Sequence, residues 1–303
     1  MKISQGDGTM KETKNRCLGA LIGLAIGNAL GAPFEYIDME KLPEINDFHS
    51  GGIYNLNAGE WTDDVSMALC LAESLIEDGF DFDSQMKKYL KWIDEGLYSC
   101  KKTAFGIDNQ TMDALIQYEK DASLPKIIDK DSHKPLARLA PIPMYFKNSF
   151  NDAVFYSGQS AYTTHNNIYS IHSCKFIGGF IQQAINGATK RVLLEEVHRH
   201  MDLIYDVKLK IVDVTYKDIN DLINDGKAIN SLEIALWTIH NTNSFKDAVL
   251  TAVRFGGDTD TLGAIVGQMS GALYGLENIP KVWLLKLSKK DMILELAEKL
   301  CNK

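Results

Sequence analysis

Two apolar stretches have a glycine at every fourth position, one within residues 18–33 and the other within residues 262–275. The first contains Gly19, Gly23, Gly27 and Gly31, and the second contains Gly263, Gly267, Gly271 and Gly275. On a helix, residues spaced by four lie on nearly one stripe. Each glycine costs about 1 kcal/mol of helix propensity relative to alanine, but it permits the close approach of another backbone. The pattern predicts two central helices that pack closely, each being a candidate partner of the other.

The remaining apolar positions predict further helices and no alternation of strands with helices. Helical patterns mark residues 62–79, 84–97, 111–120, 168–185, 193–203, 232–240, 245–255, 283–287 and 292–300. Residues 207–214 alternate like a strand but are equally compatible with a helix, and residues 37–60 and 121–137 have the composition of irregular segments. We expect one all-α domain over residues 14–303, preceded by a flexible leader at residues 1–13.

Charge and cysteine usage narrow the function classes. The 303 residues have a net charge of −8 with scattered basic residues, which argues against bulk nucleic-acid binding. The five cysteines are odd in number and far apart, so we expect buried free thiols in a reducing compartment. Residues 18–33 resemble a signal peptide, but Asp7 and Glu12 precede them and the run is shorter than the roughly 20 residues of a membrane span. We therefore expect a cytoplasmic, soluble protein with no membrane segment.

Two acidic motifs stand at the starts of predicted helices. One is Thr62-Asp63-Asp64, and the other is Asp258-Thr259-Asp260-Thr261 after two glycines. They offer only hard oxygen ligands, which suit magnesium, manganese or calcium better than zinc. Taken alone, the first motif is typical of a helix cap. Four buried like charges brought together would repel strongly without counter-ions, so a dinuclear metal site is the simplest joint interpretation.

Other interpretations of the second motif fit the sequence less well. An EF-hand loop would need ligands where Leu262 and Met269 stand. A phosphotransferase motif of the Asp-x-Asp-x-Thr type would need threonine at position 262 and a preceding strand. Neither glycine-rich phosphate loop, Gly-x-x-x-x-Gly-Lys or Gly-x-Gly-x-x-Gly, is present in the chain.

From about Lys14 to its end, the chain resembles the ADP-ribosylglycohydrolases of the dinitrogenase reductase-activating glycohydrolase type. The resemblance rests on Gly-Asn-Ala-Leu-Gly-Ala-Pro-Phe-Glu (27–35), Trp-Thr-Asp-Asp-Val-Ser-Met-Ala-Leu (61–69), Thr-His-Asn (164–166), Ser-Leu-Glu-Ile-Ala-Leu-Trp (231–237) and Phe-Gly-Gly-Asp-Thr-Asp-Thr-Leu-Gly-Ala (255–264). It implies a single orthogonal multi-helix bundle around two Mg²⁺ or Mn²⁺ ions.

The resemblance also implies roles for individual residues. The metal ligands fall on Thr62, Asp63, Asp64, Asp258, Asp260 and Thr261. Glu35 corresponds to the family's acid near the end of the first helix, and the general base is left open among Glu35, Asp63 and Asp258. His165 and Asn166 match a segment that lines the ligand cleft, although a capping or core role for His165 stays open.

The function that the resemblance implies is metal-assisted hydrolysis of an ADP-ribosyl bond to a protein side chain or a related small acceptor, by a monomer. A non-catalytic ADP-ribose-binding or structural relative on the same scaffold is the alternative. A metal-dependent hydrolase of another ribosyl or phosphate ester is a third.

Residues 132–140 depart from the family pattern. Members commonly have a glycine-rich loop here whose backbone amides hold the ADP-ribose phosphates, whereas this chain has Ser-His-Lys-Pro-Leu-Ala-Arg-Leu-Ala. Pro135 has no N–H and restricts Lys134 to extended conformations. We expect Lys134 and Arg138 to contact the substrate as cations instead, which would make ADP-ribose binding weaker and more sensitive to salt. Two further departures are Asn28, where the family usually has aspartate, and Val65, where it often has threonine.

Overall fold

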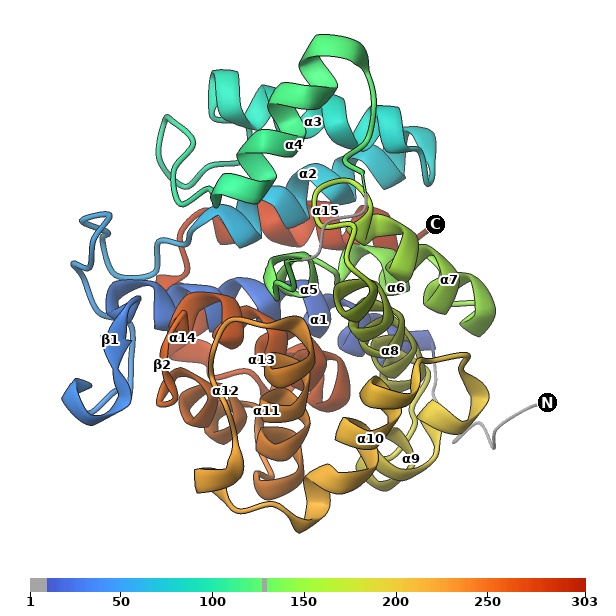
Figure 1. Cartoon of the computed structure of the whole chain (residues 1–303). Coiled ribbons are helices and arrows are strands. Elements are labelled where there is room, and N and C mark those ends of the chain that lie inside the picture. Colours follow the sequence, from blue (N-terminus) through green and yellow to red (C-terminus); the bar gives the residue numbers. More distant parts are fainter. Residues whose placement is uncertain (1–9, 127–129) are drawn as a thin grey trace.

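The computed structural model describes residues 10–126 and 130–303, and these residues form an almost entirely helical structure (Figure 1). The α-helices are α1 (Met10–Gly31), α2 (Asp63–Asp78), α3 (Phe82–Glu95), α4 (Asn109–Asp121), α5 (Lys134–Ala137), α6 (Pro141–Tyr145), α7 (Phe150–Ala161), α8 (Ile168–Ile185), α9 (Lys190–Glu195), α10 (Tyr205–Asp213), α11 (Ala228–Asn241), α12 (Phe245–Val253), α13 (Thr259–Tyr274), α14 (Lys281–Lys286) and α15 (Lys290–Cys301). Short 3₁₀ helices are η1 (Ala32–Phe34), η2 (Met39–Lys41), η3 (Val197–His200), η4 (Val214–Tyr216), η5 (Ile219–Asp221) and η6 (Leu276–Asn278). The expected all-α class is confirmed, and residues 207–214 are helical.

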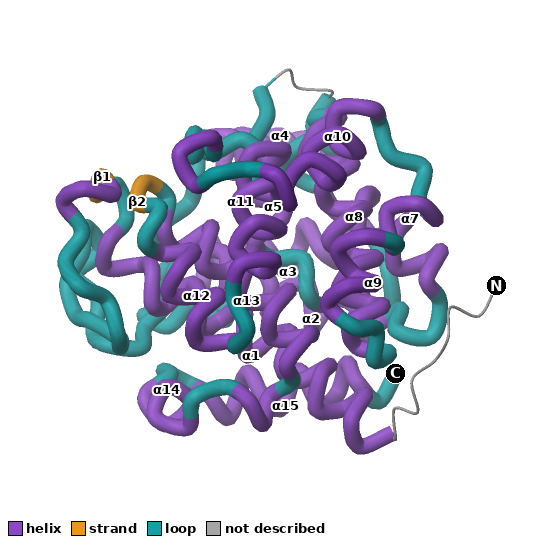
Figure 2. Tube along the Cα trace, turned by 90° about the horizontal axis from the view of Figure 1, so that it is seen from below, coloured by secondary structure: helices purple, strands orange, loops and turns teal. Residues whose placement is uncertain are grey.

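Helix α1 runs through the middle of the molecule, with α2, α3 and α4 on one side and α11, α12 and α13 on the other (Figure 1). The same central position of α1 and α13 is visible from below in Figure 2. Every residue of α1 from Cys17 to Gly31 is buried, and so is every residue of α13 from Thr259 to Leu273. The core of the protein is therefore built on these two helices.

The two glycine stripes face each other. A Cβ atom on Gly23 would lie 2.3 Å from the carbonyl oxygen of Gly267, and one on Gly27 would lie 1.9 Å from that of Gly263. Contacts of the same kind pair Gly19 with Gly271. The helices are thus antiparallel. Their backbones are in contact, and this close packing is what the glycine spacing predicted. This packing brings the end of α1 to the start of α13, where the Thr259 hydroxyl donates to the Gly31 carbonyl at 2.8 Å.

Beyond the two helices, the same two segments stay side by side in a small sheet. Strand β1 (Ile37–Asp38) pairs antiparallel with β2 (Gly256–Gly257). Strand β1 lies within residues 37–60, which we expected to be irregular. Gly256 has a φ of +70°, and a Cβ there would lie 2.5 Å from the Met39 nitrogen, so only glycine fits. The pairing holds the chain after α1 against the chain before α13, which places Glu35 beside Asp258.

The N-terminal boundary and the membrane argument need correction. Helix α1 already begins at Met10, so residues 10–13 of the expected leader are helical, while residues 1–9 lie outside the described part. The helical segment Met10–Phe34 is long and apolar enough to cross a membrane, so the argument that the run is too short was wrong. Its apolar window is completely buried inside the protein, as expected for a core helix, and it is weak evidence for a membrane span.

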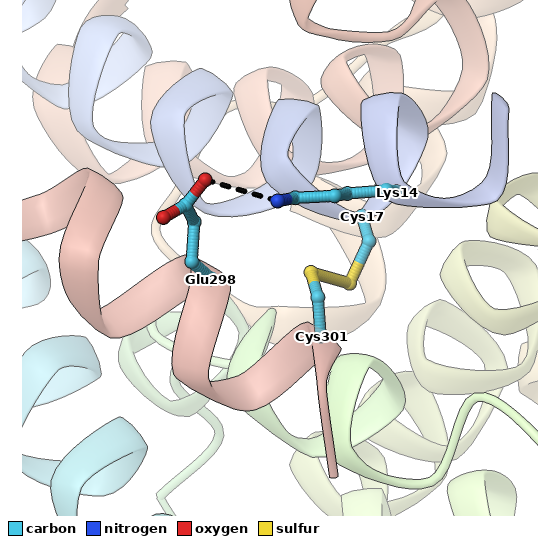
Figure 3. Close-up of a disulfide and its surroundings, with 4 residues drawn as sticks. All are labelled: Lys14, Cys17, Glu298 and Cys301. Carbon is cyan, nitrogen blue, oxygen red and sulfur yellow. Dashed lines mark ion pairs between the residues drawn. A yellow bond between two sulfur atoms is a disulfide. The ribbon is translucent and has the colours of Figure 1, made fainter. Parts of the chain in front are cut away.

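A disulfide joins the first and last helices, which contradicts the expectation that all cysteines are free. Cys17 of α1 is bonded to Cys301 of α15, beside an ion pair between Lys14 and Glu298 (Figure 3). The two cysteines are 284 residues apart, so sequence spacing contained no sign of their pairing. The other cysteines, Cys70, Cys100 and Cys174, are buried and free, as expected.

Thiol counting checks this bond. Denaturation without reductant should expose three alkylatable thiols, and prior reduction should expose all five, as read by mass spectrometry. Because the bond closes a very long loop, Cys301→Ser should lower the free energy of unfolding by about 2–4 kcal/mol under oxidising conditions. Glu298→Gln breaks only the neighbouring exposed ion pair and should cost less than about 1 kcal/mol. Five reactive thiols without reductant would show that the bond does not form.

Candidate metal centre

The two acidic helix starts meet in one buried cluster of carboxylates. One oxygen from each of Asp63, Asp64 and Asp260 lies within 4.8 Å of the others, and the same holds for Glu35, Asp258 and Asp260. Asp260 belongs to both groups, so the cluster has the form of two adjoining cation sites with one shared ligand. The expected convergence of the two motifs is confirmed, and Glu35 lies among the candidate metal ligands.

Hydroxyl and amide groups connect the two helix starts. The Thr62 hydroxyl donates to Asp260 Oδ2 at 2.6 Å, and the Thr261 hydroxyl donates to Asp64 Oδ2 at 3.0 Å. Thr62 occupies the N-cap position of α2, but its side chain makes no capping hydrogen bond because it turns into the cluster. Asn28 of α1 accepts from the Thr62 backbone at 2.8 Å and donates to the Thr62 hydroxyl at 2.8 Å. All six ligand residues expected from the sequence are therefore brought together, with Asn28 as a neutral residue beneath them.

Burial changes the ionisation of these carboxylates. It raises the pKa of Asp63 and Asp260 well above the usual value, raises that of Asp64, and raises the pKa of Glu35 to about 7. Burial also raises the pKa of Asp258, but the neighbouring Lys134 and His133 outweigh it and hold this pKa well below its usual value. Asp258 is therefore the carboxylate of the metal-free cluster that ionises most readily.

Unpaired oxygens in the cluster fit a bound cation. Glu35 Oε2, Asp258 Oδ1 and Asp260 Oδ1 are buried and, among the described residues, accept no hydrogen bond. A buried carboxylate oxygen without a donor is costly unless a cation compensates it. The three residues belong to the same group of candidate ligands, and carboxylate oxygens are the ligands that Mg²⁺ and Mn²⁺ prefer. The residues present therefore fit the expected divalent ions.

Lys134 lies inside the cluster, which the sequence did not predict. Its ammonium group donates to the Thr261 hydroxyl at 2.7 Å and lies 3.6 Å from Asp258 Oδ2. Burial lowers the pKa of Lys134, but the surrounding aspartates, Asp258 first, raise it well above the usual value. The charge of Lys134 is thus directed at the carboxylates, and its contact with substrate phosphates stays a prediction.

His133 is a second residue of the centre that sequence reasoning missed. Its Nε2 lies 2.9 Å from Asp258 Oδ2, and its Nδ1 lies 2.8 Å from the Ser231 hydroxyl of α11. The only sequence signal was indirect, because residues 132–137 and 231–237 had each been singled out for other reasons. His133 holds Asp258 in position and links it to α11.

The expected substrate-binding residues lie outside this cluster. Arg138 is almost completely buried, donates to the Thr164 and Thr163 hydroxyls at 2.5 and 3.2 Å, and lies over the ring of Tyr89. This is the placement of a structural cation, in contrast to the expected phosphate contact. With both Lys134 and Arg138 buried, the expected salt-sensitive binding of ADP-ribose loses its basis.

His165 and Asn166 are placed differently from each other. His165 is fully buried, shares a hydrogen bond of 2.8 Å with the Thr164 hydroxyl, and has Nε2 3.5 Å from Asp108 Oδ1. Burial lowers the pKa of His165, so this placement favours the alternative of a core histidine. Asn166 is partly exposed and donates to the Pro125 carbonyl at 3.2 Å, which leaves a substrate contact open to it.

Comparisons with known proteins identify relatives that match nearly the whole chain. The model of the ADP-ribosylglycohydrolase family matches residues 9–303. The chain is 36% identical to the ADP-ribosylarginine hydrolase Tri1 of Serratia proteamaculans (strain 568), covering 95% of this chain and 80% of that protein. It is 27% identical to the ADP-ribosyl-[dinitrogen reductase] glycohydrolase of Rhodospirillum rubrum, covering 91% of each. A solved structure described as an ADP-ribosylglycohydrolase-related protein complex aligns with a TM-score of 0.86 and 34% identity, covering 96% of this chain and 99% of that one.

Proposed function

This chain belongs to the ADP-ribosylglycohydrolase family, and we propose that it releases ADP-ribose from an ADP-ribosylated arginine side chain or a related ADP-ribosyl acceptor. The observation that carries the proposal is the pair of carboxylate groups that share Asp260. Arginine is the first acceptor to consider, because two relatives at 36% and 31% identity are described as ADP-ribosylarginine hydrolases.

The carboxylate cluster would hold Mg²⁺ or Mn²⁺ through Asp63, Asp64, Asp258, Asp260 and the hydroxyls of Thr62 and Thr261. A bound divalent cation supplies Lewis-acid polarisation of water and a fixed contact for the ribose hydroxyls next to the scissile bond. The shared Asp260 and the link from Asp258 through His133 to α11 would keep these ligands in position. Side chains held on packed helices give such a site the rigidity that positioning of the ribose requires.

Glu35 would orient the attacking water and accept its proton. The water oxygen forms a bond to C1 of the ribose while the bond from C1 to the acceptor breaks, through a state with positive charge on the ring. The acceptor leaves with the electrons of the broken bond and takes up the proton that Glu35 received, so Glu35 returns to its carboxylate form. A general base is most effective when its pKa is near the working pH, and burial raises the pKa of Glu35 in the metal-free protein to about 7.

Glu35→Gln tests this role. We expect ADP-ribose release to fall by about 10²–10⁴-fold, the typical effect of removing a general base. Binding of an ion at Asp63, Asp64 and Asp260 should persist, because Glu35 is not in that group. Turnover and Mn²⁺ titration on one sample measure both quantities, and Glu40→Gln, on an exposed neighbour, is the matched control. Near-normal turnover in Glu35→Gln would move the base to Asp63 or Asp258.

An acceptor assay tests the function itself. The protein is incubated with Mg²⁺ or Mn²⁺ and with ADP-ribosylated arginine, ADP-ribosylated serine or O-acetyl-ADP-ribose, and free ADP-ribose is measured. We expect release from the arginine conjugate. Binding of ADP-ribose without release from any of the three would favour the alternative of a non-catalytic relative, for which the changed residues 132–137 are the supporting observation.

We further propose that the protein acts as a monomer in the cytoplasm, without binding membranes or bulk nucleic acid. The net charge of −8 supports the absence of bulk nucleic-acid binding, and the complete burial of its most apolar helix supports the absence of a membrane span. The Cys17–Cys301 disulfide is of a kind that is rare in reducing compartments, so the location is the part of the proposal to test first. Light scattering would measure the oligomeric state, and fractionation of cells would locate the protein.

A further inference from the structure

Lys134 places a positive charge beside the second group of carboxylates. Lys134 is the first residue of the short helix α5, so the expectation that Pro135 would hold it in an extended conformation was wrong. Its ammonium group is 2.7 Å from Thr261 Oγ1 and 3.6 Å from Asp258 Oδ2, and its side chain is only 10% exposed. Lys134 is thus a fixed positive charge built into the centre.

Among the described carboxylates, Lys134 forms its ion pair with Asp258, which belongs to the second group only. The Thr261 hydroxyl donates to Asp64 and accepts from Lys134, so a lone pair that a metal ion would use is already occupied. Asp258 Oδ2 faces Lys134 and His133 together. Among the described residues, the hydrogen bonds and ion pairs of the Lys134 ammonium go to Thr261 and Asp258, and Asp258 belongs only to the group with Glu35 and Asp260.

We propose that Lys134 makes the two cation positions unequal. One divalent ion binds tightly at Asp63, Asp64 and Asp260, and a second binds at Asp258 and Asp260, beside Glu35, only against the charge of Lys134. Occupancy of the second position, and with it the assembly of the full centre, then depends on the concentration of free metal. This inference rests on the proposed metal-dependent function and adds a residue that tunes it.

The size of the effect follows from electrostatics. An ammonium group and a divalent ion held a few ångströms apart repel each other strongly even at the effective dielectric constant of a protein surface. We expect the second ion to bind at least about tenfold more weakly than the first. Removing the charge while keeping the length of the side chain should bring the two affinities closer.

Titration of metal-free protein with Mn²⁺ tests this directly. Calorimetry gives the two affinities, and electron paramagnetic resonance distinguishes a single Mn²⁺ ion from a coupled pair. For the wild type we expect a signal of isolated Mn²⁺ at one equivalent and a coupled pair only at much higher concentration. Lys134→Met should tighten the second binding step at least about tenfold, and Lys130→Met, on an exposed lysine of the same segment, should behave like the wild type.

Two equally tight ions in the wild type, or an unchanged second step in Lys134→Met, would overturn the inference. The wild-type titration stands alone if Lys134→Met does not fold, which circular dichroism would reveal, and Lys134→Gln is the replacement variant. ADP-ribose release is measured separately. Equal affinities with normal release would reject the role of Lys134 and leave the proposed function intact, whereas unequal affinities without release would do the reverse.

Discussion

Asp260→Asn should abolish tight divalent-cation binding and ADP-ribose release together. Asp260 is the carboxylate shared by both groups of candidate ligands, so its charge would contribute to the binding of both ions. A ligand that binds only the folded state adds about 2.7 kcal/mol of stability at 100 times its dissociation constant. We expect most of that gain to disappear, as measured by thermal unfolding with and without Mg²⁺.

The metal-free variant should not be less stable than the metal-free wild type. Asparagine has nearly the same size and can still accept the hydrogen bond of the Thr62 hydroxyl, while one of five clustered carboxylates is removed. A loss of the Mg²⁺ effect at unchanged intrinsic stability therefore reports on the site alone. The double variant Asp258→Ala with Asp260→Ala should lose the Mg²⁺ effect as well.

A matched control is available in Asp108. This carboxylate lies outside both groups and caps α4 through hydrogen bonds from the Gln110 and Thr111 amides at 2.9 and 3.0 Å. Asp108→Asn should leave the stabilisation by Mg²⁺ unchanged. An unchanged Mg²⁺ effect in Asp260→Asn would mean that the ions bind elsewhere.

Gly23→Ala should destabilise the fold by about 2 kcal/mol or more, although alanine is the better helix former. The propensity gain is about 1 kcal/mol. Against it, the added Cβ would lie 2.3 Å from the Gly267 carbonyl oxygen and 3.1 Å from the Gly271 Cα, and both are backbone atoms of a buried helix. Overpacking in a core typically costs about 1–3 kcal/mol and occasionally more, and here no side chain can move to relieve it. Urea unfolding measures the difference.

Gly158→Ala is the matched control within another helix. Its Cβ would approach the Lys175 Cγ at 2.8 Å, but this is part of a flexible side chain that can move away. We expect a change near zero or a slight stabilisation, since the helix propensity improves. If Gly23→Ala is as harmless as Gly158→Ala, close backbone contact between α1 and α13 is not what holds the core together.

Loss of the contact between α1 and α13 should also weaken metal binding. Asn28 lies one turn from Gly31 on α1, and its amide contacts Thr62 and, at 3.4 Å, Asp260. A shift between the helices therefore moves the neutral support beneath the ligands. Weaker Mn²⁺ binding in the folded fraction of Gly23→Ala is the expected consequence.

Features encoded by local pattern could be predicted from the sequence. Helical periodicity, the glycine stripes of α1 and α13, and the acidic starts of α2 and α13 each depend on residues within a few turns of one another. The chemistry of hard oxygen ligands then predicted that the two acidic segments meet around divalent ions, because buried like charges need counter-ions. These local rules were sufficient for the all-α class and for the four clustered aspartates, whereas Glu35 was assigned through the family resemblance.

Only tertiary packing determined which groups the long side chains contact and which distant segments lie together. The direction of Lys134 into the carboxylates, the burial of Arg138 against Thr164, and the partnership of His133 with Asp258 depend on how residues 132–138 lie over α13 and α11. The Cys17–Cys301 bond depends on α15 returning to α1. A lysine has the same local preferences whether it faces solvent or a buried acidic cluster, and a cysteine has the same preferences whether or not a partner lies opposite. Only the assembled fold distinguishes these cases, because the deciding interaction is with residues far away in the chain.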